Sequence, residues 1–231
     1  MLQLFPTGFE EVEHTDGGIE LVAYTDAGGE ERLWQAFGGA RSSPVEPGWE
    51  DRWRDFHRPV SVGQLWVGPP WETPAPGLGA VVIDPGRAFG TGAHATTRLC
   101  LALLQEQPLG SLLDIGCGSG VLSIAAAVLG FAPVLAVDND PAAVEATLAN
   151  AAANGVTLRA ELVAGDEPLP SADVAVANIS AASVAALSGR VDAARLITSG
   201  YLITDEPAVV GYERLDRRRI DGWVADVHAR V

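Results

Sequence analysis

The residues with the clearest chemical potential lie in a glycine-rich stretch, Asp114-Ile115-Gly116-Cys117-Gly118-Ser119-Gly120. It stands between an apolar run, Leu112–Ile115, and an apolar helical pattern, Val121–Leu129. Glycines in such a turn let a ligand approach the bare backbone, and the start of a helix offers free amide groups. Asp138 ends the next apolar run, Val134–Val137, where a carboxylate can accept hydrogen bonds from ribose hydroxyls. The pattern therefore predicts a binding site for a ligand that contains a ribose.

The spacing of the glycines separates two kinds of ribose-containing cofactor. A dinucleotide fingerprint reads GxGxxG, whereas this sequence reads GxGxG and has Val121 where the third dinucleotide glycine would stand. A nicotinamide-dependent oxidoreductase is therefore the second choice. With Asp114 ahead of the glycines, the stretch resembles motif I of the class I S-adenosylmethionine methyltransferases, and Val137-Asp138 resembles their ribose-holding motif. Asp114 taken alone could also be a turn residue.

Two further stretches resemble one family of these enzymes. Asp84-Pro85-Gly86-Arg87-Ala88-Phe89-Gly90-Thr91-Gly92-Ala93-His94-Ala95-Thr96-Thr97 is similar to the DPGxAFGTGxHxTT signature of the ribosomal protein L11 methyltransferases. Asn178-Ile179, after the apolar run Val174–Ala177, is similar to the VANI motif of the same family. The segment Trp49–Phe56 with His57 resembles the family's connection between its two domains. The resemblance extends from about Trp49 to Leu202.

This resemblance implies S-adenosyl-L-methionine as cofactor, S-adenosyl-L-homocysteine as its product, and no metal. It implies methyl transfer to protein amines, either a lysine side chain or an N-terminal amine, with ribosomal protein L11 as the protein substrate. Asp138 would hold the ribose, Gly116 would let the methionyl part lie against the backbone, and Asn178 would orient the amine as the catalytic residue. The predicted cofactor contacts are Thr97, Asp114, Gly116, Gly118, Asp138 and Asn178.

The sequence departs from the family pattern at several places. The substrate-recognising domain at the N-terminus is reduced to about forty residues, Ala95 stands where proline is common, and Ser180 stands where leucine is usual. These departures leave two alternatives open. The same fold could methylate another protein or a small amine, or it could bind S-adenosylmethionine without catalysis. Asn178 could also form an Asx-turn with no catalytic part.

The elements that must position these residues alternate between strand-like and helix-like patterns. This alternation predicts an α/β fold, a three-layer, doubly wound Rossmann-like sheet that is mostly parallel. Asp221-Gly222 between two alternating runs predicts an antiparallel hairpin at the C-terminal edge of the sheet. The predicted strands are Leu65–Val67, Ala80–Ile83, Leu112–Ile115, Val134–Val137, a short one near Leu162, Val174–Ala177 and Arg195–Leu202. The predicted helices are Thr96–Leu104, Val121–Leu129, Pro141–Asn154, Ala181–Ala194 and the short Glu206–Tyr212.

Three segments are expected along the chain. Residues 1–42 form a reduced, small α+β domain of the substrate-recognition type, residues 43–60 form a linker and connecting helix, and residues 61–231 form the S-adenosylmethionine-dependent methyltransferase domain. In the first segment, alternation predicts a strand at Ile19–Tyr24 and the apolar spacing predicts a helix at Glu31–Phe37.

Composition limits the function further. The 231 residues contain no lysine, so all 15 basic residues are arginines, and 30 acidic residues bring the net charge to -15. The missing lysines exclude a Schiff base or a P-loop, and the negative charge disfavours direct nucleic-acid binding. Two cysteines are too few for a disulfide framework, so we expect a cytoplasmic protein. The start of the sequence, MLQLFPTGFEEVEH, has no positively charged region followed by an apolar stretch, and no run reaches 18 apolar residues, so neither export nor membrane association is expected.

Overall fold

The computed structural model describes residues 10–13, 19–22, 27–37, 39–41, 58–84, 92–163 and 167–231. The chain divides into two compact units, Met1–Arg52 and Trp53–Val231, which we describe separately. The predicted connecting helix at Trp49–Phe56 lies outside the described residues, as does the part of the signature stretch at 85–91.

The first unit contains two short strands and one helix. Strands β1 (Glu10–Glu13) and β2 (Ile19–Val22) pair antiparallel, and helix α1 spans Ala27–Phe37. The sequence predicted β2 and the second half of α1. The helix begins at Ala27, earlier than predicted. Its first turn holds Gly28-Gly29, and because glycine is a poor helix former, the sequence did not indicate a helix there.

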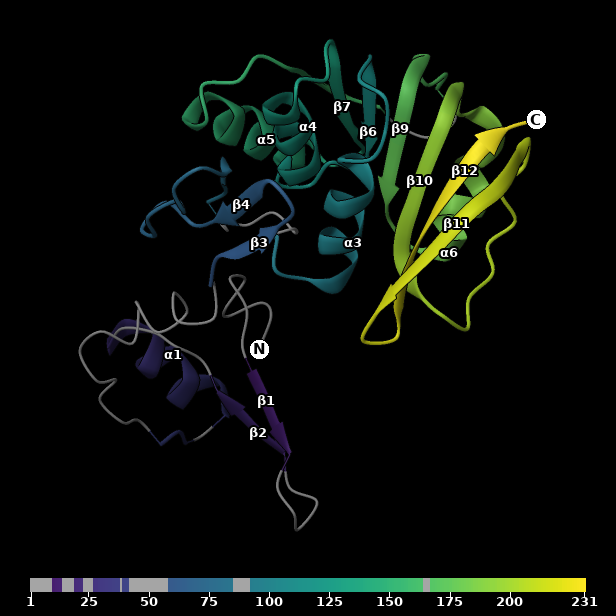
Figure 1. The fold of residues 1–231 in the computed structure, drawn as a ribbon. Coiled ribbons are helices and arrows are strands. Elements are labelled where there is room, and N and C mark those ends of the chain that lie inside the picture. The colour runs from purple at the N-terminus through teal and green to yellow at the C-terminus, as the bar shows by residue number, and fades with distance from the viewer. Residues whose placement is uncertain are drawn as a thin grey trace. The chain divides into compact units, whose positions relative to one another are not determined.

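The second unit is built on a seven-stranded sheet with the order β11-β12-β10-β9-β6-β7-β8 (Figure 1). The five strands from β10 to β8 run parallel, whereas β12 pairs antiparallel with both β10 and β11. The predicted fold class is therefore confirmed. The strands are β6 (Leu112–Ile115), β7 (Val134–Asp138), β8 (Arg159–Leu162), β9 (Ala172–Asn178), β10 (Ala193–Leu202), β11 (Tyr212–Ile220) and β12 (Trp223–Arg230).

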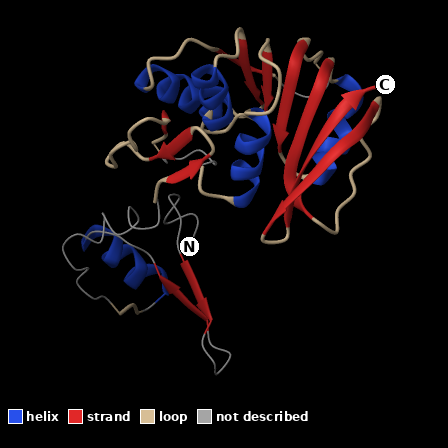
Figure 2. Cartoon of the chain, in the orientation of Figure 1, coloured by secondary structure: helices blue, strands red, loops and turns tan. Residues whose placement is uncertain are grey.

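Helices cover both faces of this sheet (Figure 2). Alternate residues of each strand point to opposite faces, so Leu112 packs with helices α3 (Ala95–Leu104) and α4 (Val121–Leu129), while Leu113 packs on the other side. Helix α5 (Pro141–Ala153) lies over β7 and β8. Helix α6 (Ala181–Leu187) packs against β10. The result is the three-layer arrangement that the alternating pattern predicted.

A second, three-stranded sheet adds to the core on the side of α4. It consists of β3 (Val60–Val62), β4 (Leu65–Gly68) and β5 (Gly79–Val82). Side chains of β4 and β5 join the same buried apolar cluster as α3 and α4. The sequence predicted β4 and β5 but missed β3.

Two predicted helices differ in the structure. The predicted helix Ala181–Ala194 is wrong beyond Leu187, because the chain passes through a 3₁₀ turn at Ser188–Arg190 and enters β10 at Ala193. Small apolar residues fit a buried strand as well as a helix, so periodicity could not place this boundary. The predicted helix Glu206–Tyr212 is absent. This segment contains Pro207 and Gly211, whose φ is +80°, so an irregular turn replaces the helix.

The predicted C-terminal hairpin is confirmed. Asp221 and Gly222 connect β11 to β12 with φ of +51° and +81°. Two successive positive φ angles are those of a type I′ turn, whose twist matches that of the strands it connects. The antiparallel pair of β11 and β12 stands at one end of the strand order and so forms one edge of the sheet.

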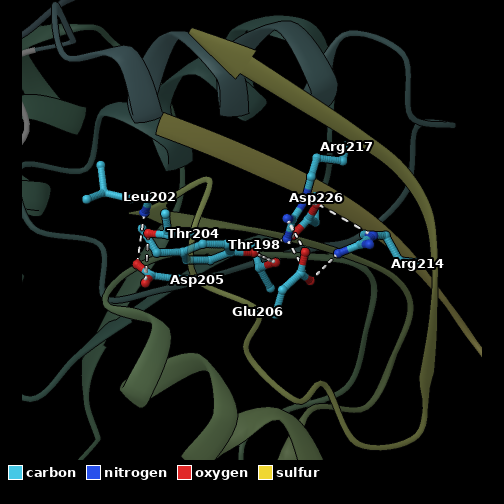
Figure 3. Close-up of polar contacts among 9 residues, drawn as sticks. Thr198, Leu202, Thr204, Asp205, Glu206, Arg214, Arg217 and Asp226 are labelled. Carbon is cyan, nitrogen blue, oxygen red and sulfur yellow. Dashed lines mark hydrogen bonds and ion pairs between the residues drawn. The ribbon is translucent and has the colours of Figure 1, made fainter. Parts of the chain in front are cut away.

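A polar network connects the strands of this edge (Figure 3). Tyr201 donates a hydrogen bond of 2.7 Å to Asp226, and Arg217 donates two more to the same carboxylate, at 2.7 and 2.8 Å. Asp226 is only 1% exposed. Glu206, from the irregular segment, accepts hydrogen bonds from Arg214 and Arg217. Arg214 and Arg217 of β11 therefore fasten this segment to the sheet.

Candidate active site

A cavity of about 490 Å³ lies at the carboxyl ends of β6, β7 and β9. Ligands of open parallel sheets bind at this edge, where loops leave neighbouring strands. Five of the six residues predicted to contact a cofactor line the cavity: Thr97, Gly116, Gly118, Asp138 and Asn178. The fold therefore brings together residues that are more than eighty positions apart in the chain.

The glycine loop forms one wall of the cavity. The backbone amides of Gly116 and Cys117 both donate to the carbonyl of Val137, at 2.8 and 3.1 Å, which fastens the loop to the end of β7. Gly116 has a φ of +75°, and a Cβ at this residue would lie 2.5 Å from Cγ2 of Ile179. The position therefore requires glycine for both its conformation and its close contact.

Asp138 stands beside this loop at the end of β7. Its Oδ2 accepts a 3.0 Å hydrogen bond from the amide of Gly118, and its Oδ1 accepts one of 3.0 Å from the amide of Asp140. A carboxylate has about four acceptor positions, so Asp138 can fix the loop and still accept hydrogen bonds from hydroxyl groups in the cavity.

Asp114, the sixth predicted contact, lies elsewhere. It does not line the cavity; its carboxylate is buried and accepts from the backbone amide and the hydroxyl of Ser123, at 3.1 and 2.5 Å. Ser123 is in the first turn of α4, and Gly120 gives this helix no side-chain cap. Asp114 thus caps α4 from β6, as carboxylates at helix N-termini commonly do.

Burial makes the charge on Asp114 costly. Desolvation is the largest cause, and it raises the pKa of Asp114 to about 6. The hydrogen bonds from Ser123 lower the pKa, and the nearby charge of Asp138 raises it by a smaller amount. In the unfolded chain an aspartate has a pKa of about 3.9. The contribution of Asp114 to the free energy of unfolding is therefore fully present below about pH 4 and is lost as the pH rises through 6.

We expect Asp114→Asn to remove this pH dependence, because the amide stays neutral and can still accept from Ser123. Between pH 4 and pH 6, the free energy of unfolding should fall more steeply in the wild type than in the variant, by up to the slope of one proton, about 1.4 kcal/mol per pH unit. Urea denaturation at several pH values measures both slopes. Equal slopes in the two proteins would show that Asp114 is not the titrating group.

Asn178 ends β9 and Thr97 lies in α3. Both face the cavity from the side opposite β7, the strand that Asp138 ends. The Nδ2 of Asn178 is 3.4 Å from Oγ1 of Thr97, to which it donates. In the Asx-turn considered from the sequence, Oδ1 of Asn178 would accept from the backbone amide of Ser180; the structure shows no such hydrogen bond between these two described residues, and the amide nitrogen pairs with a distant residue instead. Within the described part of the chain, its Oδ1 has no hydrogen-bond donor. This oxygen can accept from a ligand.

Several lining residues were missed by the sequence analysis. Ile179 follows Asn178 directly, and its packing on Gly116 could have been suspected from the motif. Leu187 and Arg190 reach the cavity through α6 and the 3₁₀ turn. The guanidinium of Arg190 also donates to the carbonyl of Glu167. No sequence signal identified Leu187 or Arg190, because the predicted helix continued past the turn that places them.

Known proteins resemble this chain in sequence and structure. The model of the family described as ribosomal protein L11 methyltransferase (PrmA) matches residues 21–213. A ribosomal protein L11 methyltransferase of Symbiobacterium thermophilum is 40% identical over 191 residues, which are 80% of this chain and 62% of the relative. One from Yersinia pseudotuberculosis is 49% identical over 137 residues, 57% of this chain and 47% of the relative. The crystal structure of a ribosomal protein L11 methylase from Lactobacillus delbrueckii subsp. bulgaricus has a TM-score of 0.66 and 28% identity, and the match covers 75% of this chain and 99% of that one.

The parallel sheet with its antiparallel edge, the glycine loop and the carboxylate at the end of the next strand define a class I methyltransferase fold. The chain belongs to the ribosomal protein L11 methyltransferase family. It spans 62% and 47% of the length of the two curated relatives described above.

Proposed function

We propose that the protein transfers methyl groups from S-adenosyl-L-methionine to protein amines, either a lysine side chain or an N-terminal amine, and that its substrate is ribosomal protein L11. The observation that carries this proposal is the meeting of Gly116, Asp138 and Asn178 in one cavity. The names of the relatives support ribosomal protein L11 as the acceptor.

The residues of the cavity fit the chemistry of the cofactor. Asp138 would accept hydrogen bonds from the ribose hydroxyls, and the bare backbone at Gly116 would receive the methionyl part. Apolar side chains at Val137, Val163 and Leu169 also line the cavity and suit the faces of an adenine ring.

When bound, S-adenosylmethionine supplies a methyl group on a cationic sulfur, and the carbon–sulfur bond breaks, with its electrons returning to sulfur, as the carbon–nitrogen bond forms. Asn178 Oδ1 would accept an N–H of the amine and point the nitrogen lone pair toward the methyl carbon. Thr97 would hold the amide of Asn178 in this orientation.

The amine must be neutral before it reacts, although a lysine amine in water has a pKa of about 10.4. Desolvation in the cavity and the cationic sulfur both favour the neutral form. We therefore infer that the amine loses its first proton to water on entering the site. The second proton leaves the methylated amine after transfer, so no dedicated base is required.

Charge and compartment also agree with this proposal. A net charge of -15 attracts basic protein segments and repels nucleic acid, so we infer a protein partner and no direct nucleic-acid binding. Both cysteines are buried and free, which agrees with work in the reducing cytoplasm. In the ranges that the structure describes, no helix is long and apolar enough to cross a membrane.

A direct test combines binding with transfer. Purified protein is titrated with S-adenosylmethionine by calorimetry and then incubated with radiolabelled cofactor and purified ribosomal protein L11. We expect binding, and labelled methyl on L11 that mass spectrometry places on amines. Binding with no transfer to L11 would contradict the proposed substrate, and binding of NAD in place of S-adenosylmethionine would contradict the proposed cofactor.

Asp138→Ala should weaken S-adenosylmethionine binding about 10- to 100-fold, because it removes charge-assisted hydrogen bonds to the ribose and releases the amide of Gly118. Calorimetry measures the change in Kd. Asp140→Ala is the matched control, since Asp140 caps α5 by accepting from Ala142 and does not line the cavity. Equal losses of affinity in the two variants would show that Asp138 has no special part in binding.

A further inference from the structure

Gly200 occupies a position in β10 where no side chain fits. It lies at a β-bulge between Ser199 and Tyr201, with a φ of +99°. A Cβ at this position would lie 2.3 Å from the carbonyl oxygen and 2.8 Å from the nitrogen of Ile179. Both atoms belong to the backbone and cannot rotate away. The backbone of Ile179 therefore fills the space that a side chain at residue 200 would need.

Ile179 is the residue directly after Asn178, and it is held from two sides. Its amide donates a 2.9 Å hydrogen bond to the carbonyl of Ser199. Its Cγ2 lies over Gly116, at 2.5 Å from the position of a Cβ there. Ile179 is thus packed between the bulge of β10 and the glycine loop of the cavity. Because Ile179 directly follows Asn178, its position fixes the position of Asn178.

The bulge is itself fixed by the polar network of the sheet edge. Thr198 precedes the bulge and Tyr201 follows it; both are buried, and their hydroxyl groups lie 2.7 Å apart. Tyr201 also donates to Asp226, which Arg217 binds through two hydrogen bonds. Its side chain belongs to an apolar cluster against which Ile179 packs. The bulge therefore has little freedom to yield when a side chain is added at Gly200.

We propose that Gly200 is a positioning residue for Asn178. It does not line the cavity, and it acts by letting the bulge of β10 pack against the backbone of Ile179, which sets where the Asn178 amide stands. Its expected effect on methyl transfer rests on the proposed function, whereas its expected effect on the Asn178-Ile179 segment does not.

The test compares Gly200→Ala with Gly77→Ala. Gly77 also has a positive φ, of +81°, but a Cβ there would meet nothing within 4 Å. The control thus reproduces the backbone strain without the contact. Three quantities are measured in each full-length variant: hydrogen exchange of the Ile179 amide by NMR, the Kd for S-adenosylmethionine, and kcat for methyl transfer to ribosomal protein L11.

For Gly200→Ala we expect about tenfold faster exchange at Ile179 and about tenfold lower kcat, since small displacements of a positioning group cost this much or more. The Kd should change by less than about threefold, because Asp138 and the glycine loop remain in place. Gly77→Ala should match the wild type in all three measurements. If Gly200 only stabilised the fold, its replacement would lower the free energy of unfolding but would not lower kcat more than it raises Kd.

The proposal is overturned if Gly200→Ala leaves exchange at Ile179 within about twofold of wild type, or if Gly77→Ala changes kcat as much. Should Gly200→Ala not fold, Tyr201→Phe serves instead, since it keeps the ring and loses only the hydroxyl group with its hydrogen bonds to Asp226 and Thr198. That variant should also speed exchange at Ile179, and unchanged exchange would overturn the proposal. A wild type that binds cofactor but methylates nothing would contradict the proposed function, and the exchange data would still decide the role of Gly200.

Discussion

Asn178→Ala should lower kcat for methyl transfer by about 10²- to 10³-fold, the loss typical of removing one preorganised polar group at a reacting centre. The substitution removes the Oδ1 that would orient the amine and the hydrogen bond to Thr97. The Kd for S-adenosylmethionine should rise much less, because the glycine loop and Asp138 still hold the cofactor. Single-turnover transfer of labelled methyl at saturating cofactor measures the effect on the chemical step.

Ser180→Ala is the control for this prediction. Ser180 is the next residue but one and does not line the cavity; its hydroxyl caps α6 by accepting from the backbone amide of Ser183. Its loss should cost about 1 kcal/mol of stability and leave kcat within a few-fold of wild type. If Asn178→Ala also stays within a few-fold, Asn178 does not orient the amine, and the proposed transfer geometry is wrong.

Asp226→Ala should lower the free energy of unfolding by about 3 kcal/mol, the lower end of the cost of removing one partner of a buried ion pair, because Arg217 keeps its hydrogen bonds to the exposed Glu206. The change removes the buried acceptor of both the Arg217 guanidinium and the Tyr201 hydroxyl. Burial by itself would raise the pKa of Asp226, but the hydrogen bonds from Arg217 and Tyr201 hold it below its usual value. This contribution to stability is therefore present at neutral pH and is lost as the pH falls through that lowered pKa.

Urea denaturation at pH 7 measures this loss, with Asp216→Ala as the matched control. Asp216 also pairs with an arginine, Arg218, but both side chains are substantially exposed, and such pairs contribute about 0–1 kcal/mol. If the two alanine variants lose the same stability, the network around Asp226 does not behave as a buried one.

The local parts of the cofactor half of the site could be predicted from the sequence. A tight turn between a buried strand and a helix needs glycine. The spacing of Asp114, the glycines and Asp138 along the sequence is therefore enough to predict that the glycines form a turn and that Asp138 ends the next strand. The limits of β6 and α4 were predicted to the residue. Asp114 shows where this reasoning ends, because a motif does not reveal which face of a strand a carboxylate occupies. In the structure it faces Ser123 and caps α4.

The parts that could not be predicted depend on distant packing. The end of α6 and the 3₁₀ turn are decided by tertiary contacts, such as the hydrogen bonds of Ser188 to the carbonyls of Ala185 and Ala208. Arg190 reaches the cavity only through that turn. The close approach of Gly200 to the backbone of Ile179 was equally hidden, because a lone glycine in a strand pattern carries no information about which backbone approaches it.

The strand order has a consequence for how the protein is made. Gly116 and Asp138 stand at the ends of β6 and β7, which are neighbours in the sheet, whereas Asn178 ends β9, which pairs with β10, and β10 in turn pairs with β12 of the final hairpin. Since a domain generally folds as a unit during synthesis, and β6 to β12 belong to one compact unit, we expect the cavity to form only after β12 has been translated. A nascent chain that already contains the glycine loop but still lacks β12 should therefore not yet have this cavity.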